Sequence, residues 1–209
     1  MKNQLLTSFI ILLISISGFA QGGFGIFSGA SYFIGHKASP MCGILIMHSA
    51  GGEGILQMGI TYHAPVTIHG VGEAYEIGNS NIVPLGYKQK FTMFDFDYTT
   101  RIYFGDNSFE DGGIYPLFGF SLAYSPMTIT ADYYDETKYR PTFQTGKVTG
   151  LSQLGMSVGC GYDKVFENDQ ALSLQLFTNI NIPKINSYEG EFAIPNQIAL
   201  RVGYSIITY

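Results

Sequence analysis

The sequence predicts an all-β fold, a single antiparallel up-and-down transmembrane β-barrel of eight strands. Three observations support this fold class: apolar and polar residues alternate with period two, charged residues make up only 13% of the chain, and aromatic residues reach 15%. Typical soluble domains carry about 25% charged residues. After the first 20 residues no apolar run approaches the ~18 residues of a membrane helix. Only a closed barrel then pairs every backbone group within lipid.

The N-terminal segment has the three parts of a secretory signal peptide. Lys2 supplies the positive start, residues 5–16 form an apolar core, and Gly18 and Ala20 stand three before and one before a cleavage point. This core is too short for a membrane span of roughly 20 residues. We therefore predict export, removal of residues 1–20, and one barrel domain over residues 21–209 in the cell outer membrane.

The alternation is clearest over residues 91–104. Its apolar face includes Phe96, and its polar face carries Asp95, Asp97 and Arg101. Period two is the pattern of a strand with two different faces. The same pattern marks predicted strands over residues 55–64, 117–125, 152–162, 171–182 and 197–206. Two less regular strands, 24–34 and 41–48, complete the set of eight.

The composition of the polar face distinguishes a membrane barrel from a soluble β-sandwich. A solvated face carries many Lys and Glu residues, whereas this face consists mostly of Gly, Ser, Thr, Asn and Gln. Small polar residues suit the lumen of an eight-stranded barrel, which has room only for side chains. The large apolar residues of the other face suit lipid.

The connections between the predicted strands alternate in length. Short turns follow the second, fourth and sixth strands, at residues 49–52, 105–113 and 163–170. Connections at the other end cover residues 35–40, 64–90, 126–149 and 183–195. Short periplasmic turns and longer external loops are typical of outer-membrane barrels. This layout predicts that both termini lie on the periplasmic side.

Charged and amide residues of the polar face predict a polar network inside the lumen. One interpretation of its charges is a paired-carboxylate acid–base site. The other, which we favour, is an ion-pair network that offsets the desolvation of buried charges, because eight strands leave no substrate-sized cavity. The predicted lumenal residues are Asp95, Asp97, Arg101, Arg201, Gln153 and Gln175.

One predicted external loop mixes acidic residues with tyrosines. Tyr is well suited to interfaces, so this loop is a candidate partner surface, with a plain solvated loop as the alternative. Its candidate contact residues are Asp132, Tyr133, Tyr134, Asp135 and Tyr139.

Other chemistry has little support. His36 and His69 fall in predicted external loops and His48 near a periplasmic turn, so we expect no convergence with His63, and no Gly-x-Ser-x-Gly motif occurs. No spacing fits a metal site, and we predict no catalytic residue and no cofactor. The net charge of −5, with scattered Lys and Arg, argues against nucleic acid as a partner.

Only two cysteines occur, Cys42 and Cys160. They are too few for a disulfide framework. Two idle thiols are the favoured interpretation because Cys160 falls on an apolar strand face, and a single bridge is the alternative.

The chain resembles the small outer-membrane β-barrel proteins of Bacteroidota, which include PorT-like and general outer membrane protein beta-barrel families. The resemblance lies in the signal ending FAQ, the Gly- and Tyr-rich strands and the closing NQIALRVGYSI. It brings no catalytic signature. In one departure, Ile206 holds the lipid-facing phase near the C-terminus and Tyr209 does not.

The function we expect is a structural, scaffold or accessory role, performed through external loops, with outer-membrane lipids and an envelope protein as partners. Two alternatives stay open. They are an outer-membrane lipid-modifying or hydrolytic enzyme, such as an acyltransferase, and a porin-like conduit for small solutes.

Overall fold

The computed structural model describes residues 22–51, 54–79, 81–104, 111–182 and 195–208. The predicted signal peptide and Tyr209 lie outside these residues. Within them, no helix is long and apolar enough to cross a membrane. The strands are β1 Gly22–Phe33, β2 Ala38–Gly51, β3 Gly54–Glu76, β4 Ile82–Ile102, β5 Gly112–Ala131, β6 Tyr139–Pro141, β7 Gly146–Phe166, β8 Gln170–Asn181 and β9 Gln197–Thr208.

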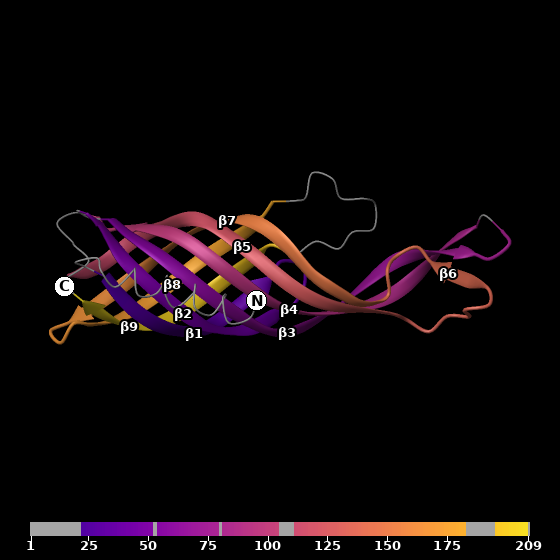
Figure 1. Ribbon diagram of the computed structural model, residues 1–209, viewed down its shortest axis with the longest axis horizontal. Coiled ribbons are helices and arrows are strands. Elements are labelled where there is room, and N and C mark those ends of the chain that lie inside the picture. The colour runs from indigo at the N-terminus through magenta and orange to yellow at the C-terminus, as the bar shows by residue number, and fades with distance from the viewer. Residues whose placement is uncertain (1–21, 52–53, 80, 105–110, 183–194, 209) are drawn as a thin grey trace, which may run out of the picture.

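Eight of the nine described strands form a closed antiparallel barrel (Figure 1). The strands pair in the order β2-β1-β9-β8-β7-β5-β4-β3, and β2 also pairs with β3, which closes the ring. The ninth, β6, joins the free edge of β3 beyond the barrel, at Ala74 to Glu76. The predicted fold class is therefore confirmed: a single eight-stranded antiparallel barrel.

The alternation of side chains in the barrel strands follows the sequence pattern. In β4, Phe96 and Tyr98 are 46% and 48% exposed on the outside, whereas Asp95 and Asp97 are buried inside. In β9, Leu200 points outward and Arg201 inward. The outer surface of the barrel is thus apolar, and its polar residues line the lumen.

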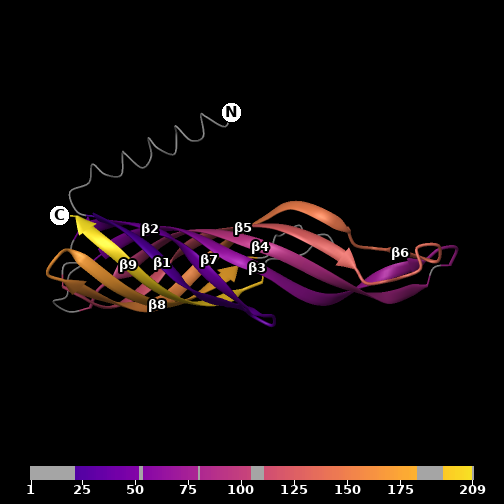
Figure 2. The same ribbon diagram turned by 90° about the horizontal axis from the view of Figure 1, so that it is seen from below.

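Four strands are much longer than the sequence pattern predicts. β3, β4, β5 and β7 have 23, 21, 20 and 21 residues, against 12 to 14 in β1, β2, β8 and β9. Figures 1 and 2 show these four strands continuing past the barrel toward β6. The predicted loops 64–90 and 126–149 are therefore wrong as loops: most of their residues form this extension.

Two β-bulges lie where the barrel passes into the extension. On β3 the register against β4 shifts between His63 and Val66, and on β7 Leu151 and Val148 pair with Ser125 and Met127. A bulge adds an unpaired residue and bends its strand, and bulges are common at barrel rims. The β3 bulge also changes which residues face inward, from odd-numbered ones such as Thr61 to even-numbered ones.

Apolar clusters close both ends of the lumen. Near the short turns, the floor cluster contains Met47, Ile55, Tyr103, Tyr115 and Ile207. At the rim of the extension lies the roof cluster, whose buried members are Phe33, Val66, Phe91, Met93, Ala123, Met127 and Ile129. Between floor and roof lie the buried charged and polar residues of the lumen, together with the rings of Phe27 and Phe177.

Candidate functional site: a layered polar lumen beneath an external extension

The lowest polar layer is built around Arg101 and Asp163. Arg101 is fully buried, and its Nη1 lies 2.6 Å from Oδ2 of Asp163. The same carboxylate accepts hydrogen bonds from the hydroxyls of Tyr103, at 2.6 Å, and Tyr115, at 2.9 Å. Arg101 also donates through Nε and Nη2 to the Oε1 atom of Gln57. Both charges are thus paired and hydrogen-bonded, which a buried ion pair requires.

The middle layer contains a second cation, Arg201. Its Nη2 lies 3.2 Å from Oδ1 of Asp97 and donates to the Thr61 hydroxyl at 3.0 Å. Its guanidinium carbon lies 4.1 Å from the ring centre of Phe27 and 4.4 Å from that of Phe177. Stacking on aromatic rings adds a cation–π attraction to the ion pair. A gap beside these residues is too narrow for a water-sized sphere.

The upper layer links His63 and Asp95. Nε2 of His63 lies 3.0 Å from Oδ2 of Asp95, and Nδ1 lies 2.9 Å from Oγ of Ser31. Asp95 also accepts a hydrogen bond from Gln197 at 2.5 Å and a longer one from Asn179 at 3.4 Å. All of these residues are buried. Each of the three layers therefore pairs one carboxylate with one basic side chain from another strand.

The predicted network residues all lie inside the barrel, and the structure identifies the partner of each charge. Asp95, Asp97 and Arg101 do not pair with one another; each pairs with a residue on another strand. The remaining predicted members, Gln175 and Gln153, are also buried. Gln175 Nε2 bonds Gln57 Oε1 and the Tyr115 hydroxyl in the lowest layer, and Gln153 donates to the Ile182 carbonyl at 3.1 Å.

Sequence reasoning missed Asp163, which it placed in the turn 163–170. In the structure Asp163 is a buried residue of β7. The sequence pattern does indicate an inward-facing Asp163, because this residue continues the inward-facing series by one step. The series consists of Gln153, Gly155, Ser157, Gly159 and Gly161. The strand simply runs further than its apolar outer face indicates.

The hydrogen-bonded residues Ser31, His63 and Asp95 are of the types found in a hydrolase triad. They could act as one only if a substrate could reach the serine hydroxyl. Ser31 is 0% and His63 1% exposed. The Phe33 ring lies 5.9 Å from the His63 ring and 5.3 Å from that of Phe91, both as centre distances. The roof cluster therefore covers these three residues, and within the described residues no space for a substrate adjoins the serine hydroxyl.

The predicted external loop residues belong to the extension. Tyr133 is fully exposed, and Asp132 is held by its amide, which donates to the Gly86 carbonyl at 2.8 Å. Tyr134 is partly buried. Tyr139 is not a loop residue: it begins β6 and pairs with Glu76.

Asp135 organises the turn that precedes β6. Its Oδ1 accepts hydrogen bonds from the Thr137 hydroxyl at 2.6 Å and the Thr137 amide at 3.0 Å. These bonds, with a smaller contribution from Lys138, hold the pKa of the Asp135 carboxyl below its usual value. The turn is therefore an ordered feature built by an ionised Asp135.

The other histidines and the cysteines form no common site. His36 and His48 lie at opposite ends of the barrel, and His69 belongs to β3, not to a loop. Among the described residues no group of three His, Cys, Asp or Glu could hold a metal ion. Cys42 and Cys160 are free thiols exposed on the outer surface.

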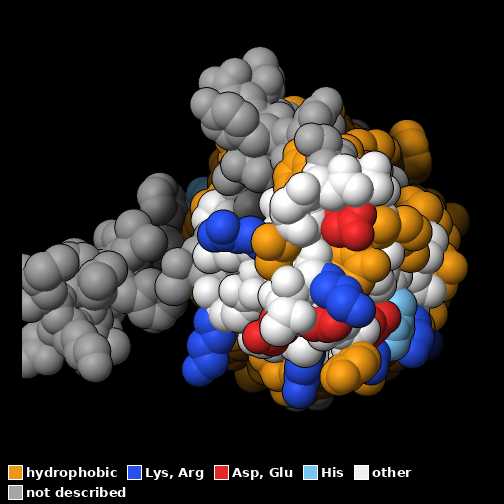
Figure 3. Space-filling model, turned by 90° about the vertical axis from the view of Figure 1, so that its right-hand side faces the viewer, with side chains coloured by type: hydrophobic (Ala, Val, Ile, Leu, Met, Phe, Trp, Pro, Cys, Tyr) orange, Lys and Arg blue, Asp and Glu red, His pale blue; other side chains and the backbone are white. Residues whose placement is uncertain are grey.

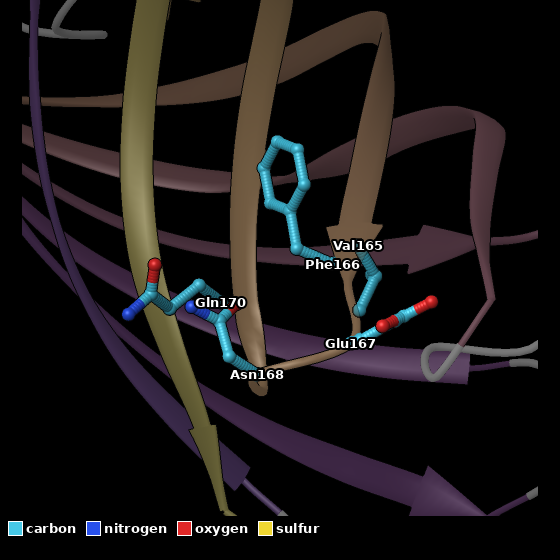
Figure 4. Close-up of a pocket in the computed structure, with 5 residues that line it drawn as sticks. All are labelled: Val165, Phe166, Glu167, Asn168 and Gln170. Atoms are coloured by element: carbon cyan, nitrogen blue, oxygen red, sulfur yellow. The ribbon is translucent and has the colours of Figure 1, made fainter.

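A cavity of about 630 Å³ opens at the β7–β8 turn and is lined by Val165, Phe166, Glu167, Asn168 and Gln170 (Figure 4). The five side chains spread around the turn in different directions, with Phe166 and Gln170 well apart. No set of polar groups converges there. This cavity therefore does not form a binding site from the residues that line it.

Similarity to known proteins is confined to the fold. No protein-family model matches the chain, and no curated protein is detectably similar in sequence. A major outer membrane protein from Thermus thermophilus is similar in structure, with a TM-score of 0.54 and 11% identity over 89% of this chain and 99% of that one. The attachment invasion locus protein Ail of Yersinia pestis has a TM-score of 0.46 and 7% identity over 90% and 99% of the two chains.

Neisserial surface protein A has a TM-score of 0.47 and 12% identity over 89% of this chain and 95% of that one. Identities this low establish the fold alone. The Thermus thermophilus protein supports the outer-membrane barrel fold seen here, and the resemblance to Bacteroidota families stays a prediction.

Proposed function

We propose that this chain is an outer-membrane barrel protein with a structural, scaffold or accessory role, which holds an external extension for an envelope protein partner. The outer surface supports the membrane placement. On β4 and the residues after it, outward side chains run from Phe94 to Phe104, over ten residue steps. At about 3.3 Å per residue and a strand tilt of about 40°, they span roughly 25 Å, the height of the apolar band of outer-membrane barrels.

The extension is the observation that carries the proposal. A membrane-spanning strand needs only about 9 to 11 residues, whereas β3 and β4 have 23 and 21. The extension has its own packing: Phe143 lies against Tyr87, with ring centres 5.2 Å apart, and its ring covers Gly72. β6 adds three paired residues to the edge of β3. Such an ordered projection is a platform for a partner.

The outer face of the extension carries apolar side chains that a partner could cover. Val71 is 73% exposed, and Tyr75, Ile77 and Ile82 are each at least 50% exposed. Tyr133, in the segment that leads from β5 to β6, is fully exposed. Exposed tyrosines and aliphatic residues on a rigid element are suited to protein recognition.

Site-specific photo-crosslinking in native cells tests the proposal. A photoreactive phenylalanine replaces Val71 or Tyr133 on the extension, and Tyr204, which points outward from the barrel strand β9, serves as the matched control position. We expect discrete protein adducts from the two extension positions and none from the control. Absence of protein adducts at both extension positions would contradict the proposal.

A hydrolase is the second candidate, because His63 is hydrogen-bonded to Ser31 on one side and to Asp95 on the other. We do not favour it, since the serine is fully buried beneath the roof cluster. A serine-directed fluorophosphonate probe separates the two functions. We expect no labelling of the folded protein, and labelling that disappears in Ser31→Ala would establish the hydrolase instead.

A further inference from the structure

Lysines that are scattered in the sequence gather on one outer face at the base of the extension. The strand registers place Thr67 of β3, Lys90 of β4, Thr128 of β5 and Lys147 of β7 opposite one another in one row. In the next row toward the tip, Lys88 lies between His69 and Thr130. We call Lys88, Lys90, Lys147 and His69 the basic patch.

The basic patch is exposed, and among the described residues its lysines lack acidic partners. The side chains of Lys88, Lys90 and Lys147 are exposed. None of the three takes part in the four ion pairs found in the described part of the chain. The described acid nearest in register is Asp132, whose carboxylate lies over Gly86, on the side toward the tip. Figure 3 views the molecule from the end that carries the extension. In this view most Lys and Arg side chains lie near the margin, and the acidic side chains lie nearer the middle.

The patch lies directly beyond the apolar band. Tyr62, Phe94 and Tyr124 stand side by side on β3, β4 and β5 and point outward, with the Tyr62 and Phe94 ring centres 5.4 Å apart. Rows of aromatic residues mark the interface of outer-membrane barrels. Lys90 lies four residue steps from Phe94 toward the extension, which is about 10 Å along the membrane normal at the usual strand tilt. That height is the headgroup layer, and a flexible lysine stem keeps its ammonium there.

We propose that the basic patch binds the phosphate of a phosphorylated membrane lipid in the leaflet facing the extension. Three ammonium groups and the hydroxyls of Thr128 and Thr130 face the same side of three adjacent strands, and the aromatic row below them contacts the acyl chains of the same lipid. A soluble polyanion would use only the upper half of this surface. The inference rests on the membrane placement proposed above.

The probe is dimyristoyl phosphatidic acid, with dimyristoyl phosphatidylcholine as the reference lipid of equal chain length. Native mass spectrometry from a neutral detergent counts the bound lipid on the full chain. The test variant is Lys88→Gln with Lys90→Gln and Lys147→Gln. The control removes the same number of charges elsewhere, by Lys138→Gln, Arg140→Gln and Lys164→Gln. Inorganic phosphate is the soluble competitor.

We expect the wild type and the control variant to prefer phosphatidic acid. The test variant should bind it about 100-fold more weakly, since each of its three lost lysines contributes on the order of a fivefold effect near an anionic surface. The proposal would be overturned if the test and control variants bound phosphatidic acid equally, either both as tightly as the wild type or both more weakly. Displacement of the lipid by an equal concentration of inorganic phosphate would also overturn it. Insertion of the wild type into neutral phosphatidylcholine vesicles is measured in parallel: failed insertion would overturn the membrane placement, whereas insertion without lipid preference would overturn the basic patch alone.

Discussion

At the scale of single residues, Arg101 and Asp163 are the pair whose loss has the clearest consequence. Arg101→Leu leaves the Asp163 carboxylate buried without its cation, and breaking a buried pair typically costs about 3–5 kcal/mol. Adding Asp163→Leu should restore much of this loss, though not all, because the hydroxyls of Tyr103 and Tyr115 then lose their acceptor. Urea-induced unfolding from lipid vesicles measures the three free energies.

The matched control adds Asp97→Leu to Arg101→Leu instead. Asp97 pairs with Arg201, so this combination breaks a second pair, and its losses should add without rescue. Additive losses for the Asp163 double variant as well would show that the two residues are not coupled.

The lumenal charges also show what a sequence reveals at this scale. Strand alternation identified the inward direction of Asp95, Asp97 and Arg101, because a one-residue slip would place charges in lipid. It did not identify their partners. Pairing across a lumen depends on the stagger between strands far apart in the chain, and Arg101 meets a residue 62 positions away. Period two contains no information on that stagger.

At the scale of elements, the outer surface of β4 that we propose to face lipid should show a depth-dependent cost for charge. An Arg near the bilayer midplane costs about 2–4 kcal/mol on a barrel exterior and about 0–1 kcal/mol near the interface. Tyr98→Arg, next to the middle of the apolar band, should therefore reduce folding into vesicles strongly, and Thr92→Arg, six residues nearer the extension on the same strand, should reduce it little. The fraction of heat-modifiable, protease-resistant barrel after refolding measures both variants. Equal yields would contradict the placement of the apolar band.

The extension was the element that sequence reasoning did not predict, and the bulges explain why. At Pro65 the inward phase of β3 passes from odd to even residues, so the alternation of residues 55–64 stops there in the sequence. Beyond the rim the outer face is no longer uniformly apolar, because Lys88 and Lys90 replace the apolar outer residues that mark a membrane strand. The polarity of 64–90 therefore predicts a long loop, whereas backbone pairing continues to Tyr75 and Ile82.

At the scale of the whole molecule, the eight-stranded closure was predicted correctly because it follows from composition and alternation together. Few charges, many aromatic residues and a small polar second face leave a closed membrane barrel as the one arrangement that satisfies the backbone. The filled lumen follows from the number of strands, because a barrel of eight strands encloses only side chains. The form of the extension does not follow from these constraints. Water can hydrogen-bond the backbone groups of many different arrangements equally well.

The two native cysteines allow the membrane position of the whole barrel to be measured without any added probe. Cys42 and Cys160 are free and exposed on the outer surface, between apolar neighbours on β2 and β7. The reactive form of a cysteine is the thiolate, which requires water. A charged maleimide should therefore label both residues in urea and neither in vesicles, and the urea sample should contain two free thiols without reductant. Tyr133→Cys in a Cys42→Ala, Cys160→Ala background is the control, and its fully exposed position should label at the same rate in both states. If the native cysteines in vesicles label as fast as this control, the apolar surface faces water and the membrane placement is wrong.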